Sequence, residues 1–246
     1  MALPKLLNPE FNTTIPSTGK DIKFRPFLVK EEKVLYMAME SGDLIDIKNA
    51  TLGVLDACIL TPDIDTKKFQ SYDIEYLFLQ LRARSVNEVM EVSLHHSKDY
   101  VRPDNGEKCP AVTKVKINVD DIKIKRDPNH KDKIQLTDKI GIQLQPPKFE
   151  DVIAITGKDG KEPSLDETIK MIGDCVVCVY DNDKVYEDYT QQEIKEFLES
   201  LTQEQFKLIQ QYFSTLPKLS YTVTWKCPDC GGEDTVVLEG LQSFFT

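Results

Sequence analysis

The chain has 246 residues, and 41 Asp and Glu against 31 Lys and Arg give a formal net charge of −10. This length suits one or two domains with sizeable cores, and 40% hydrophobic with 29% charged residues is typical of a soluble globular protein. The acidic balance argues against nucleic acids and anionic membranes as partners, because both select for clustered Lys and Arg. No apolar run approaches the roughly 18 residues of a membrane span.

The first residues lack the apolar stretch and the small-residue cleavage site of a signal peptide. We therefore expect a reducing compartment, in which the six cysteines are thiols or metal ligands and do not form a disulfide framework.

Residues 1–29 are expected to form an extended arm. Prolines at positions 4, 9 and 16 exclude a helix interior, and 17–20 (Ser-Thr-Gly-Lys) is a turn between two short β-like runs. Ile22 and Phe24 alternate with basic residues, as in a half-buried strand. Such an arm either packs on its own domain or adds a strand to a neighbour.

Three helical stretches are predicted next, over residues 30–41, 44–60 and 72–84. In the third, Ile74, Leu77, Phe78 and Leu81 recur at i, i+3, i+4 and i+7, which is the spacing of one apolar helix face. The three stretches therefore predict a helical layer with a shared core.

The hydrophobic period changes from 3.6 to 2 in the middle of the chain. Apolar and polar residues alternate over 90–94, 115–119 and 140–144, which predicts an antiparallel β region over 88–146 with one polar face.

From residue 148 the chain is expected to return to helix. Ser164, Thr190 and Thr202 are each followed three positions later by Glu or Gln, which is the capping-box pattern of a helix start. Cys175 and Cys178 fall in an apolar series and are expected to be buried thiols. Alternation returns over 219–226 and predicts a closing strand, with a second strand over 235–238.

These elements predict an α+β fold with four regions. An arm and helical region spans 1–86, a β-rich region with a degenerate knuckle spans 87–147, and a helical region spans 148–217. A β hairpin with a cysteine knuckle spans 218–246 and is expected to pack on 87–126.

The sharpest chemical feature is Cys227-Pro228-Asp229-Cys230, followed by two glycines. Two thiolates at this spacing bind one tetrahedral metal ion, while glycine permits the positive φ of the tight turn. A knuckle between two strands is half of a zinc ribbon, and a closed structural site needs two more ligands.

A partial repeat of the knuckle lies upstream. Lys108-Cys109-Pro110 repeats Lys226-Cys227-Pro228, with Val112 where the second cysteine would stand. One interpretation is a composite site for one structural Zn²⁺, in which Cys227, Cys230 and Cys109 are joined by His95 or His96, with His96 as the named candidate. The other is a decayed first knuckle that binds no metal.

No catalytic constellation is visible in the sequence. The chain has three histidines, two of them adjacent, and their positions in the sequence do not pair any of them convincingly with a Ser or Cys nucleophile; the chain also lacks a phosphate-binding glycine loop. Metal-assisted hydrolysis would need an open coordination position and a general base, and we can name no such base. We therefore expect a protein that is not an enzyme.

Two segments carry a resemblance to a known family. The distinctive parts are residues 25–33 (RPFLVKEEK), which follow the Leu3-Pro4-Lys5 start and the turn at 17–20, and residues 240–245 (GLQSFF) at the end of the stretch 238–245 behind the knuckle. Over nearly the whole chain, the sequence resembles the baseplate hub proteins of T-even-type contractile-tailed bacteriophages. The chain departs from the family's paired knuckles at Val112.

The resemblance implies a protein that builds or forms the central hub of the tail baseplate, as a hub subunit or as an assembly chaperone. Its implied partners are other hub proteins or further copies of itself, in the host cytoplasm during assembly or in the virion. The alternative is a zinc-ribbon adaptor that binds nucleic acid or a transcription or replication complex. The acidic residues around the knuckle have the wrong sign for phosphate.

Overall fold

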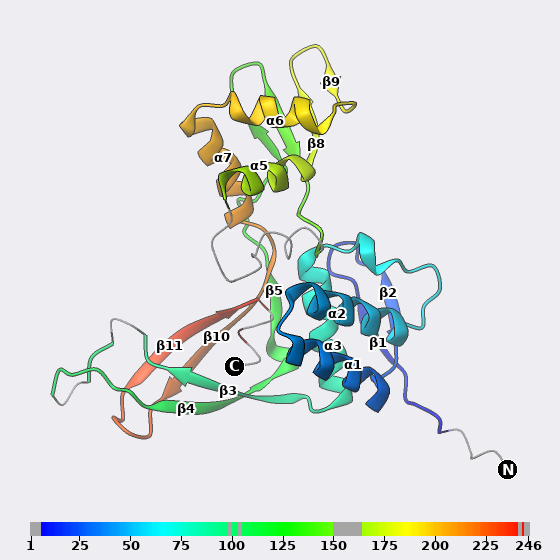
Figure 1. Cartoon of the computed structure of the whole chain (residues 1–246). Helices are drawn as coiled ribbons and strands as arrows, with labels where there is room; N and C mark the ends of the chain where they lie inside the picture. The colour runs from blue at the N-terminus through cyan, green and yellow to red at the C-terminus, as the bar shows by residue number, and fades with distance from the viewer. Residues whose placement is uncertain (1–5, 98–99, 103–104, 150–163, 241–242, 244–246) are drawn as a thin grey trace.

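The structure is a computed structural model and describes residues 6–97, 100–102, 105–149, 164–240 and 243. Its helices and antiparallel sheets confirm the predicted α+β class. Figure 1 shows a helical module near the amino terminus, a projecting β arm and a second module formed by α5 to α7 with their sheet. Of the residues that carry the family resemblance, 3–5, 241–242 and 244–245 lie outside the described residues.

The amino-terminal module combines one hairpin with helices. Its elements are β1 (Phe11–Thr14), β2 (Asp21–Phe24), α1 (Val29–Ser41), α2 (Leu44–Cys58), the short 3-10 helix η1 (Thr66–Lys68) and α3 (Ser71–Ser85). Ile15, Ile22 and Phe24 from the hairpin are buried against Leu55 of α2 and Leu77 of α3. Residues 11–24 of the predicted arm therefore pack on their own module, which is the first of the two expected alternatives.

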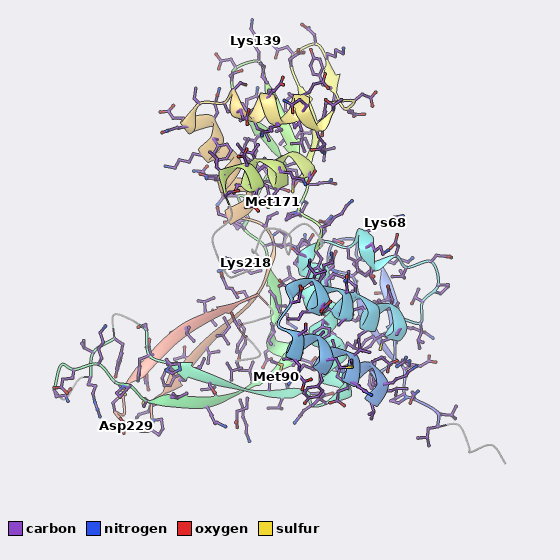
Figure 2. All side chains as sticks on the ribbon, in the orientation of Figure 1. Lys68, Met90, Lys139, Met171, Lys218 and Asp229 are labelled. Atoms are coloured by element: carbon purple, nitrogen blue, oxygen red, sulfur yellow. The ribbon has the colours of Figure 1, made fainter. Side chains whose placement is uncertain are left out.

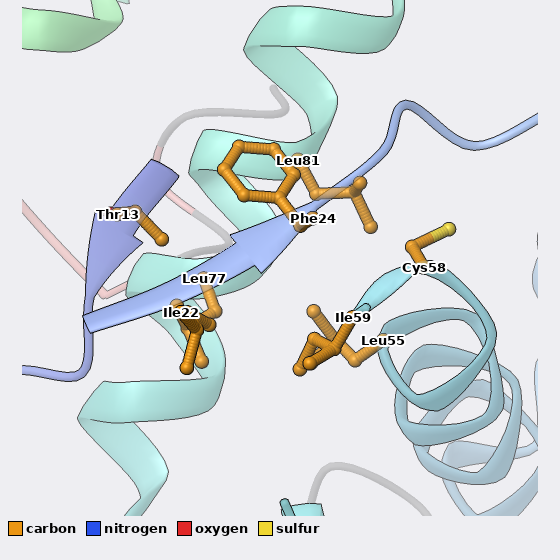
Figure 3. A pocket seen from close by; sticks show the side chains of 8 residues that line it. All are labelled: Thr13, Ile22, Phe24, Leu55, Cys58, Ile59, Leu77 and Leu81. Atoms are coloured by element: carbon orange, nitrogen blue, oxygen red, sulfur yellow. The ribbon is translucent and has the colours of Figure 1, made fainter. Parts of the chain in front are cut away.

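A small cavity lies between this hairpin and the helices (Figure 3). It measures about 10 Å³ and is lined by one threonine, Thr13, and by the apolar side chains of Ile22, Phe24, Leu55, Cys58, Ile59, Leu77 and Leu81. A cavity of this size and polarity is a packing defect that holds at most about one water molecule. It does not offer a binding site for a substrate.

The β arm consists of two hairpins and one short strand that pairs with the second hairpin. Its elements are β3 (Val89–His95), β4 (Val112–Asn118), the 3-10 helix η2 (Val119–Asp121), β5 (Lys123–Lys125), β10 (Lys218–Lys226) and β11 (Glu233–Glu239). β3 pairs with β4, and β10 lies between β5 and β11. Apolar residues on alternate positions of β3 and β10, including Val92, Leu94, Val223 and Trp225, share one buried cluster. The period-two pattern thus gives each hairpin one apolar face, and the two faces pack together.

The carboxy-terminal module packs helices on a four-stranded antiparallel sheet of order β6-β7-β8-β9. Its elements are β6 (Lys133–Gln135), β7 (Gly141–Leu144), α5 (Leu165–Asp174), β8 (Val176–Tyr180), β9 (Val185–Tyr186), α6 (Gln191–Glu199) and α7 (Gln203–Ser214). The capping boxes predicted at Ser164, Thr190 and Thr202 are all formed, and each begins one of these helices.

One expectation about this module is wrong. Residues 148–217 are predicted to be a helical region, but α5 ends at Asp174 and Val176–Tyr180 is strand β8, paired with β7 and β9. A run of five residues rich in valine is compatible with the helical period of 3.6 and with the strand period of 2. Pairing in the middle of a sheet determines that this run is a strand. Cys175 and Cys178 are buried thiols as expected. The domain limits at 86, 147 and 217 stay a prediction. The pairing of β7 with β8 joins the expected regions 87–147 and 148–217 in one sheet.

Candidate metal centre

The knuckle forms a tight turn at the end of β10. The Cys227 N–H donates to the Gly232 carbonyl at 2.9 Å, and the Gly231 N–H donates to the Cys227 carbonyl at the same distance. Gly231 has a φ of +68°, a left-handed conformation that costs a residue with a Cβ about 1–2 kcal/mol. Glycine at this position therefore sets the turn that carries Cys227 and Cys230.

The other hairpin brings two further side chains to the same place. His96 follows the last residue of β3, and Cys109 precedes β4, so the segment 97–108 begins and ends beside the knuckle. Figure 2 shows Asp229 of the knuckle at the far end of the arm from Met90, which lies near the arm's base. The four side chains therefore meet at the tip of the β arm.

The ligand atoms of His96, Cys109, Cys227 and Cys230 all lie within 4.8 Å of one another. The sulfurs of Cys109 and Cys227 are 3.9 Å apart, and His96 Nε2 lies 3.4 Å from the sulfur of Cys230. Zn–S bonds of about 2.3 Å and Zn–N bonds of about 2.0 Å require tetrahedral spacings of about 3.8 Å between sulfurs and about 3.5 Å between sulfur and nitrogen. The donor set and its spacing therefore fit a zinc ion.

The two adjacent histidines have different environments in the structure. His95 is the last residue of β3, pairs with Val112 and is exposed. His96 has only 3% of its side chain exposed and lies in the cluster. Neighbouring residues on an extended chain face opposite sides, so only one of the two enters the cluster.

Hydrogen bonds lower the pKa values of the two knuckle cysteines and so favour the thiolate form, which binds metal cations. The backbone N–H of Cys230, followed by His96, lowers the pKa of the Cys227 thiol to about 6 against the effect of burial. The Tyr100 hydroxyl lowers the pKa of Cys230, with the two atoms 3.4 Å apart. The pKa of Cys109 is raised, because burial and the two nearby thiols outweigh a hydrogen bond from the Ala111 backbone. Three sulfurs so close together cannot all ionise unless a cation compensates their charge.

Several residues that the sequence did not single out surround the four candidate ligands. Asp234 Oδ2 lies 3.1 Å from His96 Nδ1, and the Tyr100 ring stacks on the His96 ring at 3.7 Å between centroids. Trp225 contacts the same ring, with centroids 4.6 Å apart. The Tyr100 hydroxyl also lies so near Gly232 that a Cβ there would overlap it. Asp234 and Tyr100 escaped the sequence analysis because only folding brings them to the histidine.

The chemistry of such a centre is that of a closed structural site. Around a zinc ion, the four protein groups would supply all four positions of a tetrahedron and leave none open for water or substrate. Within the described residues, no other group of three or more His, Cys, Asp or Glu side chains has comparable geometry.

Comparison with known families identifies the class of protein. The family described as T4 bacteriophage base plate protein matches residues 8–246, nearly the whole chain. The chain therefore belongs to this phage baseplate family, and the family resemblance stated from the sequence is confirmed. Comparisons with curated proteins and with solved structures gave no significant match. Among the helices of the described residues, none has the length and apolar character that crossing a bilayer requires.

Proposed function

We propose that this baseplate protein helps to build the central hub of the phage tail, as a hub subunit or as an assembly chaperone. It acts by presenting surfaces to other hub proteins and catalyses no reaction itself. Membership of the baseplate family supports the general role. The observation that carries the proposed mode of action is the apolar surface of α1.

Helix α1 exposes an unusual number of large apolar side chains. Its buried residues are Glu31 and Ala38, whereas five apolar side chains are between 49% and 79% exposed. These five, here named the α1 surface, are Val29, Val34, Tyr36, Met37 and Met39. Helices usually bury such residues, and large apolar side chains that a helix leaves exposed are available for contact with another protein. Methionine adapts its shape to a partner, which suits a contact made during assembly.

The charge of the chain adds a second constraint on partners. A net charge of −10 favours association with basic surfaces and disfavours nucleic acid. At the knuckle, Asp229, Glu233 and Asp234 carry negative charge within a span of six residues, which disfavours the alternative of an adaptor that binds nucleic acid.

Co-expression with candidate hub proteins, followed by size-exclusion chromatography, tests the hub role. We expect a complex with wild-type protein, and at least a tenfold loss of affinity on Met37→Glu with Met39→Glu. The matched control is Leu165→Glu with Val185→Glu, which places the same charges at exposed apolar positions of the carboxy-terminal module. Absence of any complex, together with normal hub formation in phage that lack this protein, would contradict the proposal.

We further propose that His96, Cys109, Cys227 and Cys230 hold one structural zinc ion. When bound, the ion neutralises the sulfurs and ties the two hairpins of the arm together. The spacing of the four ligand atoms and the lowered pKa values of Cys227 and Cys230 support this assignment.

Elemental analysis of purified protein tests the zinc site. We expect about one zinc per chain, lost on Cys109→Ser as well as on Cys227→Ser. His95→Ala serves as the control for the neighbouring histidine and should retain the metal. Protein purified without metal, and unable to take it up, would instead indicate a decayed knuckle.

A further inference from the structure

Asp234 lies on β11 and contacts the candidate ligand His96 although the two are 138 positions apart in the sequence. We propose that Asp234 is the positioning residue of the metal site, which holds His96 with Nε2 directed at the sulfurs. This inference rests on the zinc site proposed above and adds a residue that supplies no ligand atom itself.

The carboxylate of Asp234 is held from several sides. Its Oδ2 lies 3.1 Å from His96 Nδ1 and accepts a hydrogen bond from the Ser97 N–H at 2.9 Å. Its Oδ1 accepts from the Thr235 N–H at 2.8 Å. The Asp234 side chain is 14% exposed and that of His96 is 3% exposed. The carboxylate is therefore fixed in place and largely shielded from water.

This contact determines which ring nitrogen is free. An ionised carboxylate only accepts hydrogen bonds, so His96 Nδ1 must carry the proton. In the neutral imidazole that a metal requires as its ligand, the lone pair then resides on Nε2, which lies 3.4 Å from the sulfur of Cys230. Histidines that ligate metals commonly donate their other ring N–H to a carboxylate, which fixes the tautomer and makes the ligand more basic.

The aromatic neighbours alone do not achieve this orientation. Tyr100 stacks on His96 with an angle of 9° between the rings, and Trp225 also contacts it. Stacking fixes the plane of the imidazole, but a half-turn about the Cβ–Cγ bond preserves that plane and exchanges Nε2 with Cε1, so that a carbon replaces the nitrogen opposite the sulfurs. Asp234 removes this ambiguity, because only one of the two orientations places a nitrogen opposite its carboxylate.

Asp234 also favours His96 over His95 as the ligand. The carboxylate binds the backbone N–H of Ser97 together with the ring of His96, so it anchors the chain directly after β3. His95 lies on the exposed side of that strand. Anchoring from β11 thus sets which histidine faces the knuckle.

The test compares zinc affinity in full-length variants by competition with a chromophoric chelator. We expect Asp234→Ala to weaken zinc binding about 10–100-fold, with a smaller loss for Asp234→Asn, which keeps an acceptor but removes the charge. Glu233→Gln is the matched control, because it removes the same charge from the adjacent, exposed position and should leave affinity unchanged.

A second arm separates positioning from simple support of the fold. In a His96→Ala background, Asp234→Ala should cause little further loss of affinity, since its effect passes through His96. An equal loss in both backgrounds, or an affinity of Asp234→Ala within twofold of wild type, would overturn the inference while leaving the zinc site intact. Failure of the wild-type protein to bind zinc at all would overturn the site and the inference together.

Discussion

Removal of zinc from the arm is expected to destabilise it by an amount that follows from the topology. Cys109 and Cys227 are 118 positions apart in the sequence, and the metal would link them. Closing a loop of this length restricts the unfolded chain by about 5 kcal/mol on the chain-entropy scale used for disulfides. For a chain of this size, each kcal/mol corresponds to roughly 2–4 °C in Tm, so the expected loss is about 10–20 °C.

Thermal unfolding of zinc-loaded, chelator-stripped and Cys227→Ser protein measures this loss. Trp225 is the only tryptophan and contacts His96, so its fluorescence reports on the tip of the arm. Far-ultraviolet circular dichroism follows the whole chain in parallel. We expect the midpoint temperature of the fluorescence transition to shift more than that of the dichroism transition. The dichroism signal includes the two modules outside the arm, which hold no metal.

Cys178→Ser is the control for replacing a cysteine outside the cluster. Cys178 is buried beside Gln143 in the carboxy-terminal module. The Cys178→Ser variant should therefore retain zinc, and its Tm should respond to the chelator as the wild type does. An identical Tm and an identical tryptophan signal before and after complete removal of bound zinc would refute the argument that the metal ties the hairpins together.

The pKa of Glu31 is lowered, because hydrogen bonds from Arg25 and the Leu28 N–H outweigh the effect of burial, which alone would raise it. Its ionised form therefore stabilises the fold above the usual carboxyl pKa of 4.5, and this contribution is lost as pH falls through the lower folded pKa. Glu31→Gln should cost about 1–3 kcal/mol at neutral pH in denaturant titrations, and less near pH 3. Gly231→Ala should cost about 1–2 kcal/mol because of its positive φ, whereas Gly53→Ala, in the open on helix α2, should stabilise by up to about 1 kcal/mol.

Each of these two predictions has a result that would contradict it. A Glu31→Gln variant with the same loss of stability at pH 3 as at pH 7 would show that charge is not the source of the effect. Equal changes in the two glycine variants would show that backbone conformation at the knuckle is not the deciding factor.

The helix starts and the strands of the arm could be predicted from the sequence alone. The capping boxes at Ser164, Thr190 and Thr202 depend on residues three positions apart, and the alternation along β3 and β10 depends on each chain segment by itself. The knuckle was recognisable for the same reason, since Cys227 and Cys230 lie within one turn.

Other features were decided by the tertiary structure. The strand β8 could not be distinguished from helix by its short apolar run, and pairing with β7 and β9 settled it. The partial repeat around Cys109 suggested a third ligand, but the choice between His95 and His96 depended on which side of β3 faces β10. Asp234 reaches His96 only because two hairpins, far apart in the chain, pack through their apolar faces. Contacts over such separations depend on the packing of whole elements, and the residues near each position do not determine them.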